Sequence, residues 1–131
     1  MKKFPFDREP EIPIVTARVY GPRDWAKIRL VFDPGSAISQ IDTGIIDEIG
    51  YSAKSAHFVS SIQGPAGDSQ PGYVLTIDRL IVFGITFNSL TVGAFDFDNF
   101  SKDGIDGLLG FDLIKQLHLE MNGPKGELNI F

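Results

Sequence analysis

The chain has 131 residues, of which 43% are apolar and 22% are charged, and its net charge is −5. This length suits one domain around a single core, and an acidic chain without a basic cluster argues against a nucleic-acid-binding surface. There is no cysteine, so disulfides, thiolate catalysis and cysteine-based zinc sites are excluded.

The N-terminal stretch MKKFPFDREPEIP is charged and rich in proline where a signal peptide needs an apolar run. No segment approaches the ~18 apolar residues of a membrane helix. We therefore expect a cytoplasmic protein that does not enter a membrane, with residues 1–12 as a flexible or interface-forming arm.

Two strands are predicted next, over Ile14–Tyr20 and Ala26–Phe32, because both are rich in β-branched and aromatic residues and are separated by the turn sequence GPRD. Trp25, beside that turn, is expected to be a packing residue. The second strand ends apolar and runs directly into Asp33.

Two Asp-x-Gly triplets follow, beginning at Asp33 and at Asp42. A carboxylate that activates water needs a rigid and open position, and the end of a buried strand followed by small residues provides one. Asp33 meets that description. Asp42 directly precedes a helix predicted over residues 43–49, so we expect it to be a helix N-cap.

The rest of the chain reads mainly as strands from Ala56 to Phe95, with the loop QGPAGDSQPG at the tip of an exposed hairpin. Phe95, Phe97 and Phe100 are expected to pack in or beside the core. A helix follows Leu108-Leu109-Gly110, and ELNIF is a final strand. The pattern predicts one mostly β domain over residues 1–131, a small closed barrel with a hairpin and two short helices.

The order of these features resembles the retropepsin-like aspartic proteases. The segment LVFDPGSAISQIDTGIIDEIGY matches their first active-site segment, with Asp33 at the catalytic position and Gly35 and Ser36 in matching places. DGLLGFDLIKQL matches their second block, SSIQGPAGDSQPGY lies where the family has its flap, and LEMNGPKGELNIF resembles the terminal turn and strand.

The resemblance implies an acid-protease-type barrel and an aspartic endopeptidase that needs no cofactor or metal. Such an enzyme cleaves peptide or protein substrates as a homodimer in which Asp33 of each subunit meets on a two-fold axis, and the terminal strands pair between subunits. Ser36 would hydrogen-bond the catalytic carboxylate, unless it is simply a small turn residue. The flap would bind substrate through Ser61, Gln63, Gly64 and Gly67.

Pro34 departs from the family, which has Thr or Ser there with a hydroxyl that hydrogen-bonds across the two-fold axis. Proline offers neither a hydroxyl nor an N–H group. The alternative function is therefore a catalytically weak or inactive module of the same fold that binds peptides or assembles.

Four other polar residues are expected to play minor roles. Asp106 and Asp112 flank the second block and are expected on the solvated surface, with pairing to basic residues near a dimer interface as the alternative. His57 and His118 have no neighbour at metal-ligand spacing, so no metal site is expected.

Overall fold

A computed structural model of the chain describes residues 1–63, 69–98 and 104–131, and gives the backbone alone at 58–63 and 69–70. The helices are α1 Thr43–Glu48 and α2 Phe111–Ile114, with a 3-10 turn η1 at Ala53–Ser55. The strands are β1 Lys2–Pro5, β2 Ile14–Tyr20, β3 Trp25–Phe32, β4 Gln40–Asp42, β5 Phe58–Gln63, β6 Ser69–Val82, β7 Ile85–Phe95, β8 Gly107–Leu109, β9 Leu119–Asn122 and β10 Glu127–Ile130.

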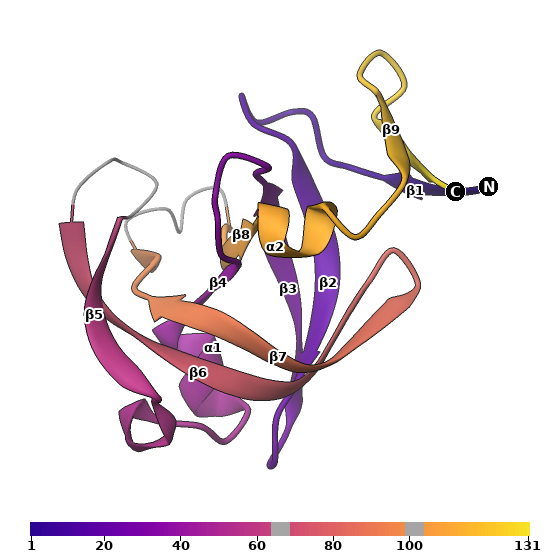
Figure 1. The fold of residues 1–131 in the computed structure, drawn as a ribbon. Helices are drawn as coiled ribbons and strands as arrows, with labels where there is room; N and C mark the ends of the chain where they lie inside the picture. The colour runs from indigo at the N-terminus through magenta and orange to yellow at the C-terminus, as the bar shows by residue number, and fades with distance from the viewer. Residues whose placement is uncertain (64–68, 99–103) are drawn as a thin grey trace.

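Six strands form a closed barrel in the order β2-β3-β8-β4-β7-β6, and β5 is attached outside β6 (Figure 1). The ring closes because β6 pairs back onto β2, with Arg18 opposite Ile81 and Tyr20 opposite Arg79. A closed ring leaves few unpaired edges, which is the usual solution for a small all-β domain. The predicted fold, mostly β with a closed barrel and two short helices, is confirmed.

Alternation along the strands builds the core. Val15, Ala17 and Val19 of β2 point inward while Thr16 and Arg18 are exposed, as expected for a strand with one face on a core. At the end of β3 both faces are covered. Phe32 belongs to the main core, whereas Val31 joins a smaller cluster with Ile14, Phe95, Phe97, Ile105 and Leu108. The core positions predicted for Phe95 and Phe97 are confirmed, and Phe100 lies outside the described residues.

A second sheet brings the chain ends together in the order β1-β10-β9 (Figure 1). It is anchored to the barrel by Leu128 and Ile130, both buried in the main core. Within the stretch 1–12, β1 pairs with β10 of the same chain and Phe6 is buried. A role for this segment in an interface between subunits stays a prediction.

The hairpin predicted around residues 63–72 is formed by β5 and β6, which pair antiparallel from Phe58 opposite Val74 to Gln63 opposite Ser69. Strand pairing therefore continues further toward the tip than the Gly- and Pro-rich sequence suggested. In Figure 1 this hairpin and the terminal sheet lie at opposite ends of the molecule.

Trp25, expected to be a packing residue, packs on the surface of the barrel and not in its core. Its side chain is 52% exposed and stacks on Tyr20, with 6.1 Å between the ring centroids. The register of β2 and β3 explains this position, because Trp25 lies opposite Tyr20 while the neighbouring Val19 points into the core. Arg18 completes the surface group, with its guanidinium carbon 5.7 Å from the Trp25 ring centroid.

Candidate active site

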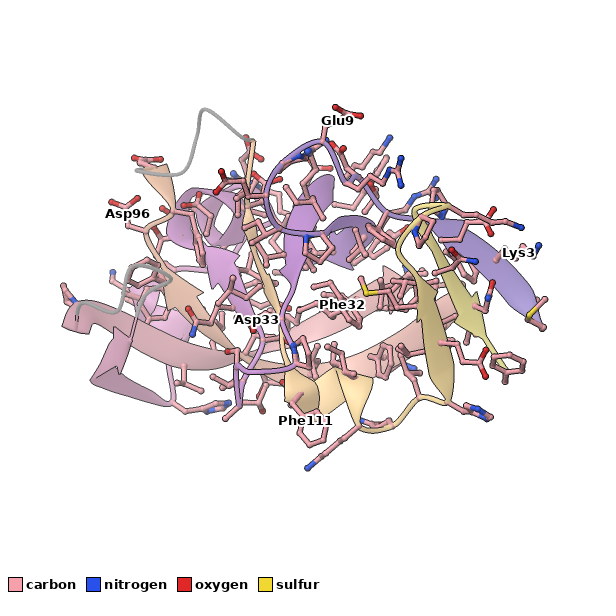
Figure 2. All side chains as sticks on the ribbon, turned by 90° about the horizontal axis from the view of Figure 1, so that it is seen from above. Lys3, Glu9, Phe32, Asp33, Asp96 and Phe111 are labelled. Atoms are coloured by element: carbon pink, nitrogen blue, oxygen red, sulfur yellow. The ribbon has the colours of Figure 1, made fainter. Side chains whose placement is uncertain are left out.

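Asp33 follows the last residue of β3 and lies beside the second sequence block. Strands β3 and β8 are parallel neighbours, with Val31 opposite Leu108 and Phe32 opposite Leu109. The Asp33 amide continues this ladder and donates to the carbonyl oxygen of Leu109 at 3.0 Å. The fold thus brings together two segments that are far apart in the sequence (Figure 2 labels Asp33).

A tight turn over Asp33–Ser36 presents the Asp33 carboxylate, which is half-buried. The Ser36 amide donates to the Asp33 carbonyl oxygen at 3.1 Å, which places Pro34 at the second position of the turn and Gly35 at the third. Proline suits that position because its fixed φ matches the turn. The Gly35 amide donates to Asp33 Oδ1 at 3.0 Å, so the carboxylate is oriented by its own loop.

Gly35 lies beside the Asp33 carboxylate. A Cβ there would lie 3.2 Å from Asp33 Oδ1, tighter than ordinary van der Waals contact. The absence of a side chain at Gly35 therefore keeps this side of the carboxylate open.

Ser36 uses its hydroxyl within the loop. Its Oγ donates to the carbonyl oxygen of Ile38 at 2.8 Å, and its own carbonyl oxygen accepts from the Phe111 amide at 2.7 Å. These contacts are those of a turn residue that also docks the loop onto α2. The hydrogen bond to the catalytic carboxylate that the resemblance implies stays a prediction.

Asp42 is the N-cap of α1, as predicted. Its Oδ2 accepts from the Gly44 amide at 3.0 Å, and its Oδ1 accepts from the Phe97 amide at 2.9 Å. Both carboxylate oxygens are therefore committed to backbone groups, and this Asp-Thr-Gly triplet is a structural one.

Sequence reasoning missed a clamp formed by Ser39, Gly110 and Asp112. Ser39 is only 1% exposed, and its amide and hydroxyl donate to the two oxygens of Asp112 at 3.0 and 2.8 Å. The Ser39 hydroxyl also accepts from the Gly110 amide at 2.9 Å. The solvated surface role expected for Asp112 is therefore wrong, and the one signal in the sequence was its position just after Leu-Leu-Gly.

Asp106 is also more than a solvated acid. It is half-buried and accepts from the Arg29 amide at 2.9 Å, while its own amide donates to the Arg29 carbonyl oxygen at 2.8 Å. Burial raises the pKa of Asp106 above 3.8, and the hydrogen bond from Arg29 opposes that rise. The Arg29 guanidinium pairs instead with Asp7 at 3.0 Å.

Two of the residues predicted to bind substrate, Ser61 and Gln63, lie on β5. The backbone of Ser61 is opposite Pro71 and that of Gln63 is opposite Ser69. Gly64 and Gly67 lie outside the described residues.

The two histidines have neighbours of other kinds than metal ligands. His57 Nε2 is 2.7 Å from Thr76 Oγ1, and the His118 ring stacks on Phe131. In the described ranges, the carboxylates close enough to share an ion are Asp42, Asp96 and Asp98, of which the last two are exposed. The hydrogen bonds of Asp42 to its helix and to Phe97 account for its position without an ion. No helix in the described part of the chain is long and apolar enough to cross a membrane.

Comparison with known proteins supports the fold and identifies the family. A retropepsin-like aspartic protease from Rickettsia conorii has a similar structure, with a TM-score of 0.67 and 14% sequence identity over 98% of this chain and 88% of that chain. At this identity the likeness concerns the fold, which is retropepsin-like. No curated protein matches the sequence. Residues 15–113, however, match the family model described as aspartyl protease, and this chain therefore belongs to the aspartyl protease family.

Proposed function

We propose that the protein is an aspartic endopeptidase that acts as a homodimer, with Asp33 of each subunit activating water to hydrolyse a peptide bond. One observation carries this proposal. Asp33 Oδ1 accepts from the Gly35 amide, whereas Asp33 Oδ2 receives no hydrogen bond from the described residues. A half-buried carboxylate just after a strand, with one oxygen that the described residues leave without a hydrogen bond, is suited to hold and deprotonate a water molecule.

The chemistry needs a second carboxylate. Two carboxylates about 3 Å apart cannot both ionise, so one is protonated and the other acts as base. The ionised carboxylate takes a proton from the water molecule while the oxygen of that water attacks the peptide carbonyl carbon. The protonated carboxyl group gives its proton to the carbonyl oxygen. Collapse of the tetrahedral species then breaks the C–N bond as the nitrogen receives a proton, and the pair titrates as a unit.

A homodimer supplies that second carboxylate most simply. Of the two Asp-x-Gly triplets in the chain, the one at Asp42 caps α1, which leaves Asp33 as the candidate, and a two-fold axis brings identical groups together. The terminal sheet is a suitable contact surface because β1 and β9 are its two edge strands. Met121 of β9 and Phe131, which follows β10, are 46% and 54% exposed in the isolated chain. We assign the terminal sheet an interface role on these grounds.

The β5–β6 hairpin is the proposed flap, which would close over an extended peptide substrate. Its backbone carries the strand geometry that pairs with a substrate through main-chain hydrogen bonds. Ser61 and Gln63, with Gly64 and Gly67, remain the proposed substrate-binding residues.

A second function rests on Pro34. The Pro34 side chain has no hydroxyl and its nitrogen has no hydrogen, so Pro34 cannot donate a hydrogen bond to a partner subunit. A weak or inactive member of the family that binds peptides without cleaving them would retain every hydrogen bond described above.

Cleavage by the purified protein distinguishes the two functions. Unfolded peptides are incubated at pH 4–7 with the wild type, with Asp33→Asn and with Asp47→Asn, whose carboxylate is exposed on α1. We expect cleavage by the wild type and by Asp47→Asn, and loss of cleavage in Asp33→Asn. Equal cleavage by all three would show a contaminating protease and remove the proposal, and binding without cleavage would favour the second function. Sedimentation of the same samples measures the dimer.

A further inference from the structure

We propose that Asp112 and Ser39 are positioning residues that hold the Asp33 loop, residues 33–39, from within its own subunit. This inference rests on the proposed function for its catalytic consequence. Its structural part, that these two side chains fix the loop, can be tested without any activity.

The clamp fixes the end of the loop through a charged acceptor. The Asp112 carboxylate accepts hydrogen bonds from both the amide and the hydroxyl of Ser39, at 3.0 and 2.8 Å. Hydrogen bonds to a carboxylate are about twice as strong as neutral ones. Ser39 is 1% exposed, so water does not compete for its groups.

Asp112 is itself held in place. It lies in the first turn of α2, whose Leu113 and Ile114 are buried in the main core. Its Oδ1 also accepts from the Leu113 amide at 3.0 Å, and its carbonyl oxygen accepts from the Gln116 side chain at 2.9 Å. The carboxylate therefore links the loop to the rigid part of the barrel.

The backbone at Gly110 lies so close to the Asp33 loop that there is no room for a side chain there. A Cβ on Gly110 would lie 2.8 Å from the Ser36 carbonyl oxygen and 2.9 Å from that of Ile38. The Phe111 amide bonds to the Ser36 carbonyl oxygen in the same contact. At the end of the loop, the Gly110 amide donates a hydrogen bond to the Ser39 hydroxyl.

The loop depends on this clamp because, among the described residues, its other side chains hydrogen-bond only within the loop. Pro34, Gly35 and Ala37 are exposed, and the Ser36 hydroxyl bonds within the loop. Asp112 supplies the one side chain from outside the loop that hydrogen-bonds to it, among the residues that the structure describes. Without a hydroxyl at Pro34, the side-chain contacts that help to hold the Asp33 loop come from within the subunit, through Ser39 and Asp112.

The test uses Asp112→Asn, which keeps the size of the side chain but replaces one acceptor oxygen by an NH₂ group, and Ser39→Ala, which removes the hydroxyl. Asp47→Asn makes the same chemical change at an exposed site and is the matched control. Amide hydrogen exchange is measured over residues 33–39 and over β2 and β10. Turnover of an unfolded peptide is measured at a protein concentration where sedimentation shows the wild-type assembly.

We expect faster exchange in residues 33–39 of Asp112→Asn and Ser39→Ala, with β2 and β10 unchanged. A shift of Asp33 of about 1 Å costs about 10²-fold in rate, so kcat should fall by about 10- to 100-fold while KM changes by less than about threefold. Asp47→Asn should match the wild type in every measurement.

Unchanged exchange in both variants would overturn the inference whatever the activity. Faster exchange with unchanged kcat would overturn the positioning role. If the wild type shows no Asp33-dependent cleavage, the proposed function fails by itself, and faster exchange in residues 33–39 still supports the clamp.

Discussion

Replacing Gly107 by alanine tests the pairing of β8 with its two neighbouring strands, which places Asp33. Gly107 begins β8, between β3 and β4, opposite Leu30 and Ile41. A Cβ at this position would lie 2.1 Å from the carbonyl oxygen of Gln40, more than 1 Å inside the 3.4 Å limit of ordinary contact. It would also lie 2.9 Å from a methyl group of Leu30.

The Leu30 side chain can turn aside, but the Gln40 carbonyl cannot. Gln40 lies on β4, which pairs with β7 on one side and β8 on the other, so moving its backbone breaks pairing at one of the two edges. Overpacking costs about 1–3 kcal/mol, and each lost hydrogen bond adds about 0.5–1.5 kcal/mol. We therefore expect Gly107→Ala to lower the free energy of unfolding by about 3 kcal/mol or more, out of a total of about 5–15 kcal/mol.

Gly123 provides the matched control. A Cβ there meets nothing within 4 Å, and its φ is not positive. Gly123→Ala should be neutral or stabilise by up to about 1 kcal/mol, because alanine reduces the entropy of the unfolded chain. Urea denaturation of the three proteins measures the differences. A loss below about 0.5 kcal/mol in Gly107→Ala, on the scale of ordinary surface substitutions, would refute the reasoning.

Two further predictions concern side chains that sequence motifs alone would misjudge. Asp42→Ala should destabilise the protein by about 1–2 kcal/mol, because it removes a helix cap. Asp33→Asn should leave thermal stability nearly unchanged. A larger loss of stability in Asp33→Asn than in Asp42→Ala, measured by calorimetry, would contradict the roles assigned to the two triplets. Burial, together with the hydrogen bond to Asp78, raises the pKa of Tyr51 from 10.0 to about 12, so the folded state holds this proton more tightly and the resulting stability is lost as pH rises from 10 to 12. The stability advantage of the wild type over Tyr51→Phe should therefore shrink by about 1 kcal/mol across that range, allowing for screening by solvent, and a constant difference in urea denaturation would disprove it.

Local patterns predicted the parts of the fold that depend on local physics. Two runs of β-branched and aromatic residues on either side of a turn sequence identified β2 and most of β3, because such side chains suit a half-buried strand. The position of Asp42 before an apolar helical face predicted its cap, since the free amides of a first turn need an acceptor nearby. Both predictions involve contacts within a few residues.

Contacts set by register and topology escaped sequence reasoning. Ser39 and Asp112 are 73 positions apart, and nothing in either segment alone shows that the chain brings them within 3.0 Å. Trp25 is exposed because of its pairing with Tyr20, and a shift of one residue would have buried it. The strands of the hairpin extend to Gln63 and Ser69 because pairing overrides the turn preference of the surrounding Gly and Pro residues.

The two Asp-x-Gly triplets show most clearly what the letters of a motif leave open. Both carboxylates accept the amide of the glycine two residues later, each at 3.0 Å, so Pro34 and Thr43 allow the same local geometry. The difference between them is tertiary. Asp42 gives its second oxygen to the Phe97 amide, whereas the second oxygen of Asp33 receives no hydrogen bond from the described residues. The proposed reactivity of Asp33 therefore rests on the oxygen that the described part of the fold leaves without a hydrogen bond, and not on the identity of the middle residue of the triplet.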